Sequence, residues 1–149
     1  LFFPRERSAP APAPVAAASD RPRAKEGETL LLIEDETSVR EVTAKLLSKL
    51  GYTVITAVDG LDGVAKAAAH EGRLDIVVSD LMMPGLGGIE AVARILERRP
   101  GLPVVFVSGY SESALRWSDD TPRAGRLLQK PFSVDDLARA VRTAIDGKR

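Results

Sequence analysis

Five side chains in this sequence are of the kinds that handle phosphoryl groups, and each follows a short apolar run. They are Glu34 and Asp35, then Asp80, Ser108 and Lys130. Three carboxylates held close together repel one another and would take up protons or a cation. A hard cation such as Mg²⁺ binds carboxylate and phosphate oxygens, a lysine suits a phosphoryl oxygen, and a hydroxyl can donate a hydrogen bond to it. Together they are the parts needed for phosphoryl transfer to a carboxylate nucleophile.

The elements that must position these side chains can be read from the apolar pattern. Short apolar runs bounded by Gly, Pro or charged residues predict buried strands, and apolar residues at helical spacing predict the helices between them. The strands are expected at 30–33, 52–57, 74–79, 103–107 and 126–129. The helices are expected after a capping box at Ser38 and Glu41, from Gly60, around 89–96, over a short stretch at 111–117, and after a cap at Ser133 with Asp136.

Strands that alternate with helices predict an α/β fold with a parallel sheet and helices on both faces. The common strand order for five strands is 2-1-3-4-5, although the pattern by itself leaves other orders open. Because the carboxyl ends of parallel strands share one edge, the three carboxylates, the hydroxyl and the ammonium group are expected to converge there. Pro84 and the glycines that follow it predict a sharply bent loop after Asp80.

Composition sets the class of protein. A length of 149 residues suits one domain. The net charge of +0 gives no reason to expect nucleic acid or an anionic membrane as a partner. No apolar run is long enough to span a bilayer. The absence of cysteine excludes disulfides and thiolate metal sites, and it fits a cytoplasmic location.

Residues 1–27 are expected to be a linker outside the fold. Half of the ten prolines precede residue 23, and the alternation of Ala and Pro favours extended polyproline II. We therefore expect a tether, with the fold beginning at Glu28. The apolar start Leu1-Phe2-Phe3-Pro4 is either a remnant or the end of a preceding domain.

At these motifs the chain resembles the receiver (phosphoacceptor) domain of two-component response regulators, a flavodoxin-like (βα)5 fold. The resemblance covers about residues 28–147. It rests on four motifs that lie in the right order at the predicted strand ends: Leu-Leu-Ile-Glu34-Asp35-Glu, Ser79-Asp80-Leu-Met-Met-Pro84 with Gly88, Val-Ser108-Gly109-Tyr, and Gln-Lys130-Pro131-Phe132.

The resemblance implies a role for each site residue. Asp80 would be phosphorylated, and Mg²⁺ would be held by Glu34, Asp35, Asp80 and the backbone carbonyl of Met82. Ser108 would be the switch hydroxyl, and Lys130 would contact the phosphoryl group.

Other features of the family carry over to single positions. Gly109 would leave room for the phosphodonor, and the Lys130–Pro131 bond would be cis. Leu127 stands where the family often has an aromatic residue, so we expect the switch to stay within residues 108–118. Gly87 stands where a polar residue is common, which favours a more mobile loop.

The residues of these motifs most resemble those of receivers at the C-terminus of hybrid sensor histidine kinases. The start at residues 1–4 resembles the last strand of a kinase ATP-binding domain, and the partner would be a histidine kinase or a histidine phosphotransfer protein. The chain itself has no kinase histidine motif and no ATP-binding motif, so it is not expected to be an enzyme beyond its own phosphorylation. A free-standing response regulator and a receiver that only docks proteins remain the alternatives.

Two other classes fit less well. A haloacid dehalogenase-type phosphatase needs a second aspartate two residues after the nucleophile, where this chain has Met82. A nucleotide-binding domain needs a glycine-rich loop after the first strand, and this chain has three acidic residues there.

Overall fold

The structure is a computed structural model, and it describes residues 22–25, 27–81, 83, 85–108, 125–130 and 132–148. Strands and helices alternate along this part of the chain. They are β1 (Thr29–Ile33), α2 (Thr37–Lys49), β2 (Thr53–Ala57), α3 (Gly60–Ala69), β3 (Ile76–Asp80), α4 (Gly88–Arg98), β4 (Val104–Ser108), β5 (Gly125–Gln129) and α6 (Val134–Lys148). None of the helices in these ranges has the length and apolar character needed to cross a membrane.

The five strands form one parallel sheet in the order β2-β1-β3-β4-β5, as predicted. The first strand, β1, therefore lies inside the sheet. The second strand, β2, lies at the edge beside it, and β3, β4 and β5 follow in order on the other side of β1. Ile33, the last residue of β1, pairs with Ser79, the residue before the last of β3, and Asp80 pairs with Val107 of β4. This register brings the carboxyl ends of the three central strands to one edge.

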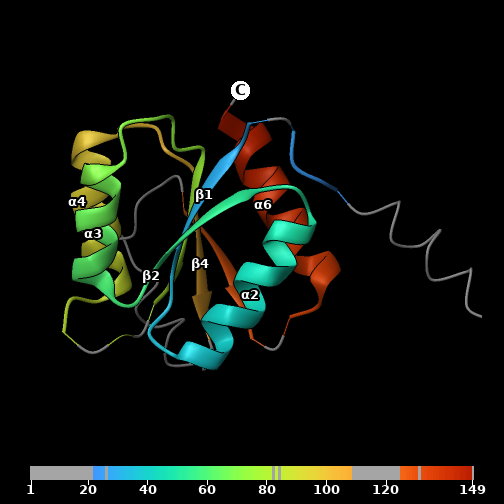
Figure 1. Cartoon of the computed structure of the whole chain (residues 1–149), viewed down its shortest axis with the longest axis horizontal. Helices are drawn as coiled ribbons and strands as arrows, with labels where there is room; N and C mark the ends of the chain where they lie inside the picture. The colour runs from blue at the N-terminus through green and yellow to red at the C-terminus, as the bar shows by residue number, and fades with distance from the viewer. Residues whose placement is uncertain are drawn as a thin grey trace, which may run out of the picture.

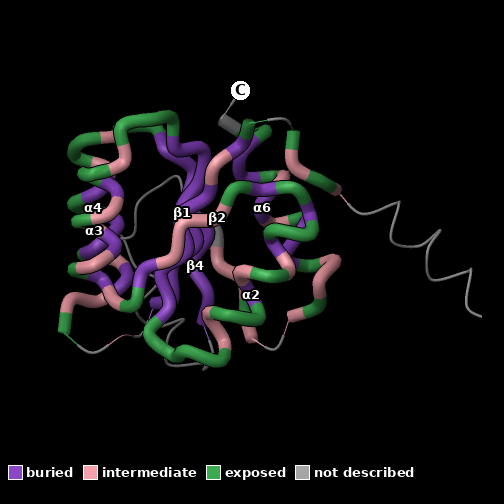
Figure 2. Tube along the Cα trace, in the orientation of Figure 1, coloured by how far each residue is buried: buried purple, intermediate pink, exposed green. Residues whose placement is uncertain are grey.

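Helices cover both faces of the sheet (Figure 1), with α3 and α4 on one side and α2 and α6 on the other. The central strands are buried from both sides, as Figure 2 shows, which explains their continuous apolar sequences. Alternate strand residues enter two separate cores. Leu30 and Leu32 pack on the α2 and α6 side, while Leu31 and Ile33 pack on the α3 and α4 side.

The predicted start of the first helix was wrong by about two residues. Helix α2 begins at Thr37, and Glu36 precedes it without a side-chain cap, so Ser38 and Glu41 lie inside the helix. The backbone N–H of Glu36 is instead bound by the side chain of Glu34 at 3.1 Å. A different local contact, between residues two apart, has thus taken the place of the predicted capping box.

The predicted cap of the last helix is confirmed. The Ser133 hydroxyl accepts from the Asp136 N–H at 3.0 Å, and the Asp136 carboxylate accepts from the Ser133 N–H at 3.2 Å. This reciprocal pair is a capping box, and it starts α6 shortly after Lys130.

Not every apolar residue at helical spacing faces the core. Leu47 and Leu50 are buried, whereas Val42 of α2 is 58% exposed. Leu61, at the start of α3, is 60% exposed. Helical spacing identifies residues on one side of a helix, but it does not say how much of that side the neighbouring elements cover.

The chain just before β1 contacts the domain. The Ala24 N–H donates to the carbonyl of Leu50 at 2.8 Å, and the Arg23 guanidinium donates to the carbonyl of Lys49 at 3.0 Å. Ala24 also packs against the core on the α2 and α6 side. The expectation that the fold begins at Glu28 is therefore wrong for these residues, which supply donors to the carbonyls left open at the end of α2.

Candidate functional site

Three carboxylates meet where β1 and β3 end. Glu34 and Asp35 directly follow β1, and Asp80 is the last residue of β3. Each offers one oxygen, and these oxygens all lie within 4.8 Å of one another. Glu34 and Asp80 are buried, whereas Asp35 is exposed. The convergence predicted from the parallel sheet is present in the structure.

Lys130 lies between two of these carboxylates. Its ammonium nitrogen is 3.4 Å from Glu34 Oε2 and 3.5 Å from Asp80 Oδ2. The backbone N–H of Lys130 donates to the carbonyl of Ser108 at 2.7 Å, which continues the pairing of β5 with β4. The lysine is therefore held by the sheet at the height of the acidic groups.

The electrostatics of this cluster favour additional positive charge. Burial raises the pKa of Glu34 to about 7, and the charge of Asp80 adds to the rise, while the Glu36 N–H and Lys130 oppose it. Burial lowers the pKa of Lys130, but the negative charges of Asp80 and Glu34 outweigh burial and leave that pKa raised. Near neutral pH the single ammonium group of Lys130 thus balances only part of the negative charge of the acidic cluster.

The donor set fits a small hard cation. Mg²⁺ binds oxygens at about 2.0–2.1 Å, so two oxygens on opposite sides of it lie roughly 4.2 Å apart. The three carboxylate oxygens already lie within 4.8 Å of one another, so they are close enough together to be ligands of one such ion. Of the four expected metal ligands, Glu34, Asp35 and Asp80 are together, and Met82 lies outside the described residues.

The backbone around Asp80 is closely packed. The buried Ser79 hydroxyl donates to the Asp80 carbonyl at 3.1 Å, and the Gly88 N–H donates to the carbonyl of Leu81 at 3.2 Å. A β-carbon at Gly88 would collide with the Asp80 carbonyl oxygen and come within 3.0 Å of its carbon. Only glycine permits this close approach, which folds the chain back across the end of β3.

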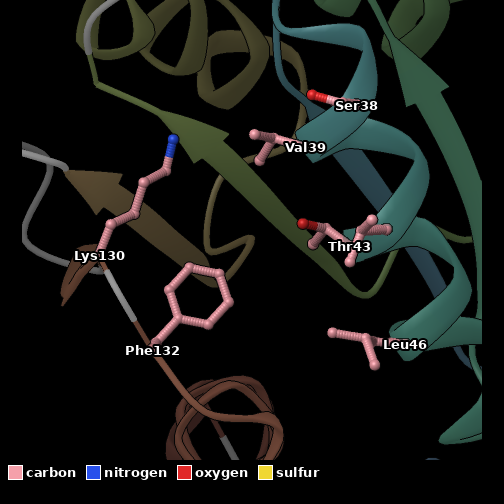
Figure 3. Close-up of a pocket in the computed structure, with 7 residues that line it drawn as sticks. Ser38, Val39, Thr43, Leu46, Lys130 and Phe132 are labelled. Atoms are coloured by element: carbon pink, nitrogen blue, oxygen red, sulfur yellow. The ribbon is translucent and has the colours of Figure 1, made fainter.

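A groove of about 440 Å³ opens beside the lysine. In Figure 3, Lys130 and Phe132 lie on one side of it and residues of α2 on the other. Its lining is mostly apolar, and it includes the exposed Val42. The lining residues are Ser38, Val39, Val42, Thr43, Leu46, Lys130 and Phe132. The sequence analysis did not predict this groove, because the exposure of Val42 and the position of Phe132 opposite α2 depend on the tertiary structure.

The structure describes only some of the other positions that the sequence analysis singled out. Ser108 ends β4 at the same edge and is 1% exposed. Leu127 is partly buried against the core on the α3 and α4 side and pairs with Phe106. Gly109, the Lys130–Pro131 bond and the loop at 109–118 lie outside the described residues.

Comparison with known proteins agrees with this geometry. The family model of the response regulator receiver domain matches residues 30–142. The sensor kinase CckA of Brucella abortus is 35% identical over 118 residues, which are 79% of this chain and 12% of that protein. The response regulator receiver protein CpdR of the same organism is 32% identical over 112 residues, which are 75% of this chain and 92% of that protein.

A solved structure gives the same result. The crystal structure of the receiver domain from the hybrid histidine kinase CckA is 32% identical, with a TM-score of 0.67 over 78% of this chain and 98% of that one. A family match over most of the chain, the expected strand order, and an acidic cluster with a lysine at one sheet edge all point the same way. The chain belongs to the response regulator receiver domains of two-component systems.

Proposed function

We propose that Asp80 accepts a phosphoryl group from a phosphohistidine of a partner protein in a Mg²⁺-dependent reaction. The observation that carries this proposal is the meeting of Glu34, Asp35, Asp80 and Lys130 at one edge of the sheet. A cluster of acidic groups that favours added positive charge suits a cation and the phosphoryl oxygens that the cation binds.

In the proposed reaction a carboxylate oxygen of Asp80 attacks the phosphorus of phosphohistidine. The new O–P bond forms as the N–P bond breaks, and the imidazole leaves with the electron pair and takes up a proton. Lys130 compensates the charge on the phosphoryl oxygens, and Ser108 is the switch hydroxyl that binds the product. Glu34, Asp35, Asp80 and the carbonyl of Met82 would hold Mg²⁺, which would supply further charge compensation when bound.

The partner is a histidine kinase or a histidine phosphotransfer protein. The groove between α2 and Phe132 supports this part of the proposal, because it places an apolar contact surface directly beside Lys130. A protein docked there would have its phosphohistidine within reach of the acidic edge. The cytoplasmic location expected from the sequence remains a proposal of the same kind.

The parent protein is proposed to be a hybrid sensor histidine kinase. The similarity to the sensor kinase CckA supports this reading, although the chain spans only 12% of that protein. The match to most of CpdR favours the alternative of a free-standing regulator. In the hybrid-kinase proposal, residues 1–27 are the Pro/Ala-rich linker expected from the sequence, and residues 1–4 are the end of a preceding ATP-binding domain.

The test is the intact mass of the full chain after incubation with acetyl phosphate and MgCl₂. One added phosphoryl group is expected, with none after chelation and none in Asp80→Asn. Label on Asp80→Asn would refute the assignment. A folded wild-type chain that binds a histidine kinase but never takes label would instead favour a docking module.

A further inference from the structure

The loop that carries two of the acidic groups has an anchor outside the acidic cluster. Arg40 lies on the first turns of α2, six residues after Glu34. One guanidinium nitrogen donates to the backbone carbonyl of Glu34 at 2.8 Å, and another donates to the Thr37 hydroxyl at 3.3 Å. The backbone N–H of Arg40 donates to the carbonyl of Glu36 at 2.9 Å. The arginine thus joins the end of β1 to the start of α2.

Besides Arg40, the Glu34 carboxylate contacts this loop by accepting from the Glu36 N–H at 3.1 Å. Helix α2 lacks a side-chain cap, so the usual device for fixing the entry of the chain into a helix is absent at Glu36. The Glu34 N–H continues the sheet by donating to the carbonyl of Ala57 at 3.1 Å. After that bond the chain leaves the sheet. The first carbonyl beyond it is that of Glu34, and Arg40 donates to this carbonyl.

The peptide group held by Arg40 joins the two acidic residues. Because a peptide group is planar, fixing the carbonyl oxygen of Glu34 also fixes the direction of the N–H of Asp35. The Asp35 side chain is exposed, so its position depends on the backbone that carries it. A contact with the carbonyl of Glu34 therefore restrains the backbone from which both side chains extend.

We propose that Arg40 is a positioning residue, which holds the Glu34–Asp35 peptide in the orientation that the cation site requires. The proposal rests on the proposed function, because it takes these two residues as Mg²⁺ ligands. Arg40 itself touches neither the cation nor the phosphoryl group. It acts on the backbone behind them, as partners of metal ligands do in other sites.

If Arg40 acts through its charge, its removal should change the affinity for Mg²⁺ in the opposite direction from that expected if it acts by positioning the ligands. The guanidinium is a positive charge near a cation site, so its loss would by simple electrostatics tighten Mg²⁺ binding. If Arg40 acts by positioning, its loss loosens the ligand pair and weakens binding. The direction of the change therefore separates the two effects.

The experiment is a calorimetric MgCl₂ titration of the full chain, with the backbone amide of Asp35 followed by NMR. Arg40→Gln is expected to raise the Mg²⁺ dissociation constant about tenfold, the lower range for loss of a partner of a metal ligand. Arg40→Lys should recover part of the loss, because one ammonium can still reach the carbonyl. Lys45→Gln removes a positive charge from an exposed position of the same helix, and its dissociation constant should stay within about twofold of the wild type.

A readout independent of folding completes the test. At saturating Mg²⁺ the rate of labelling by acetyl phosphate should return close to that of the wild type, whereas a general loss of structure would persist. If Arg40→Gln fails to fold, Thr37→Val removes the second contact without a change of charge and should weaken binding in the same direction.

The outcomes that overturn the proposal are distinct. A folded Arg40→Gln that binds Mg²⁺ as tightly as the wild type, or more tightly, refutes the positioning role and leaves the proposed function intact. A wild-type chain that binds no Mg²⁺ refutes both.

Discussion

An ion pair at the edge of the sheet opposite the acidic site gives the sharpest test of how this domain is held together. Arg142 of α6 donates to both oxygens of Glu28, at 2.7 and 2.9 Å, and to the carbonyl of Arg23 at 3.2 Å. The Glu28 side chain is 3% exposed and that of Arg142 is 12% exposed. The hydrogen bonds to Glu28, followed by that to Asp146, raise the pKa of Arg142. The pair is therefore charged and shielded from water.

The perturbation is Arg142→Met, which keeps much of the side-chain volume and removes the cation. Breaking a buried pair by removing one partner costs about 3–5 kcal/mol, because the remaining charge stays buried. With an entropy of unfolding of roughly 2.1 cal/mol/K per residue over about 120 folded residues, the melting temperature should fall by roughly 12–20 °C.

The assay is thermal unfolding followed by circular dichroism at neutral pH. Arg139→Met is the matched control, since Arg139 is an exposed arginine on the same helix, and it should change the melting temperature by no more than about 2 °C. The double variant Glu28→Gln with Arg142→Met should be more stable than Arg142→Met alone, because no buried charge remains. Labelling at Asp80 by acetyl phosphate should persist in every folded variant.

A loss below about 1 kcal/mol would refute the reasoning, because that is the value of a pair screened by water. A double variant no more stable than the single one would also refute it, since the cost would then come from packing.

Three further predictions follow from the site and its surroundings. The raised pKa of Glu34 means that the folded, metal-free domain binds this proton more tightly than the unfolded chain does. The contribution of this group to the free energy of unfolding is therefore full below about pH 4.5 and is lost as the pH rises to about 7. Urea unfolding with chelator should show this fall, Glu34→Gln should lack it, and equal pH profiles would contradict it. Gly88→Ala should push the chain away from the Asp80 carbonyl, lower stability by about 1–3 kcal/mol and slow labelling roughly tenfold or more; an unchanged rate would show that the loop adapts. A chain that starts at residue 22 should have the melting temperature of the full chain. One that starts at residue 26 loses the Ala24 hydrogen bond and should melt several degrees lower, at about 1 kcal/mol per bond lost. Equal melting temperatures for the two truncated chains would support the original prediction that the tether extends to residue 27.

The sequence by itself predicted a parallel α/β fold and the meeting of the carboxylates and the lysine at one edge, while the strand order stayed open until the structure was known. The apolar runs are short and lie between helical patterns, and parallel strands place their carboxyl ends at one edge. That was enough to expect Lys130 near Glu34, 96 positions away, without any knowledge of distances. The cap at Ser133 was also predictable, because a capping box is a local interaction between residues three apart.

Tertiary structure decided the features that depend on contacts between distant segments. The pattern of α2 marked Val42 as apolar, but only the placement of Phe132 across from it made a groove instead of core. The pair of Glu28 and Arg142 is 114 positions apart and carries no motif. Arg23 and Ala24 belong to the segment predicted to be a linker, yet they donate hydrogen bonds to the open carbonyls at the end of α2. Composition and periodicity report what a segment prefers, whereas these contacts depend on which unsatisfied groups the folded chain brings alongside it.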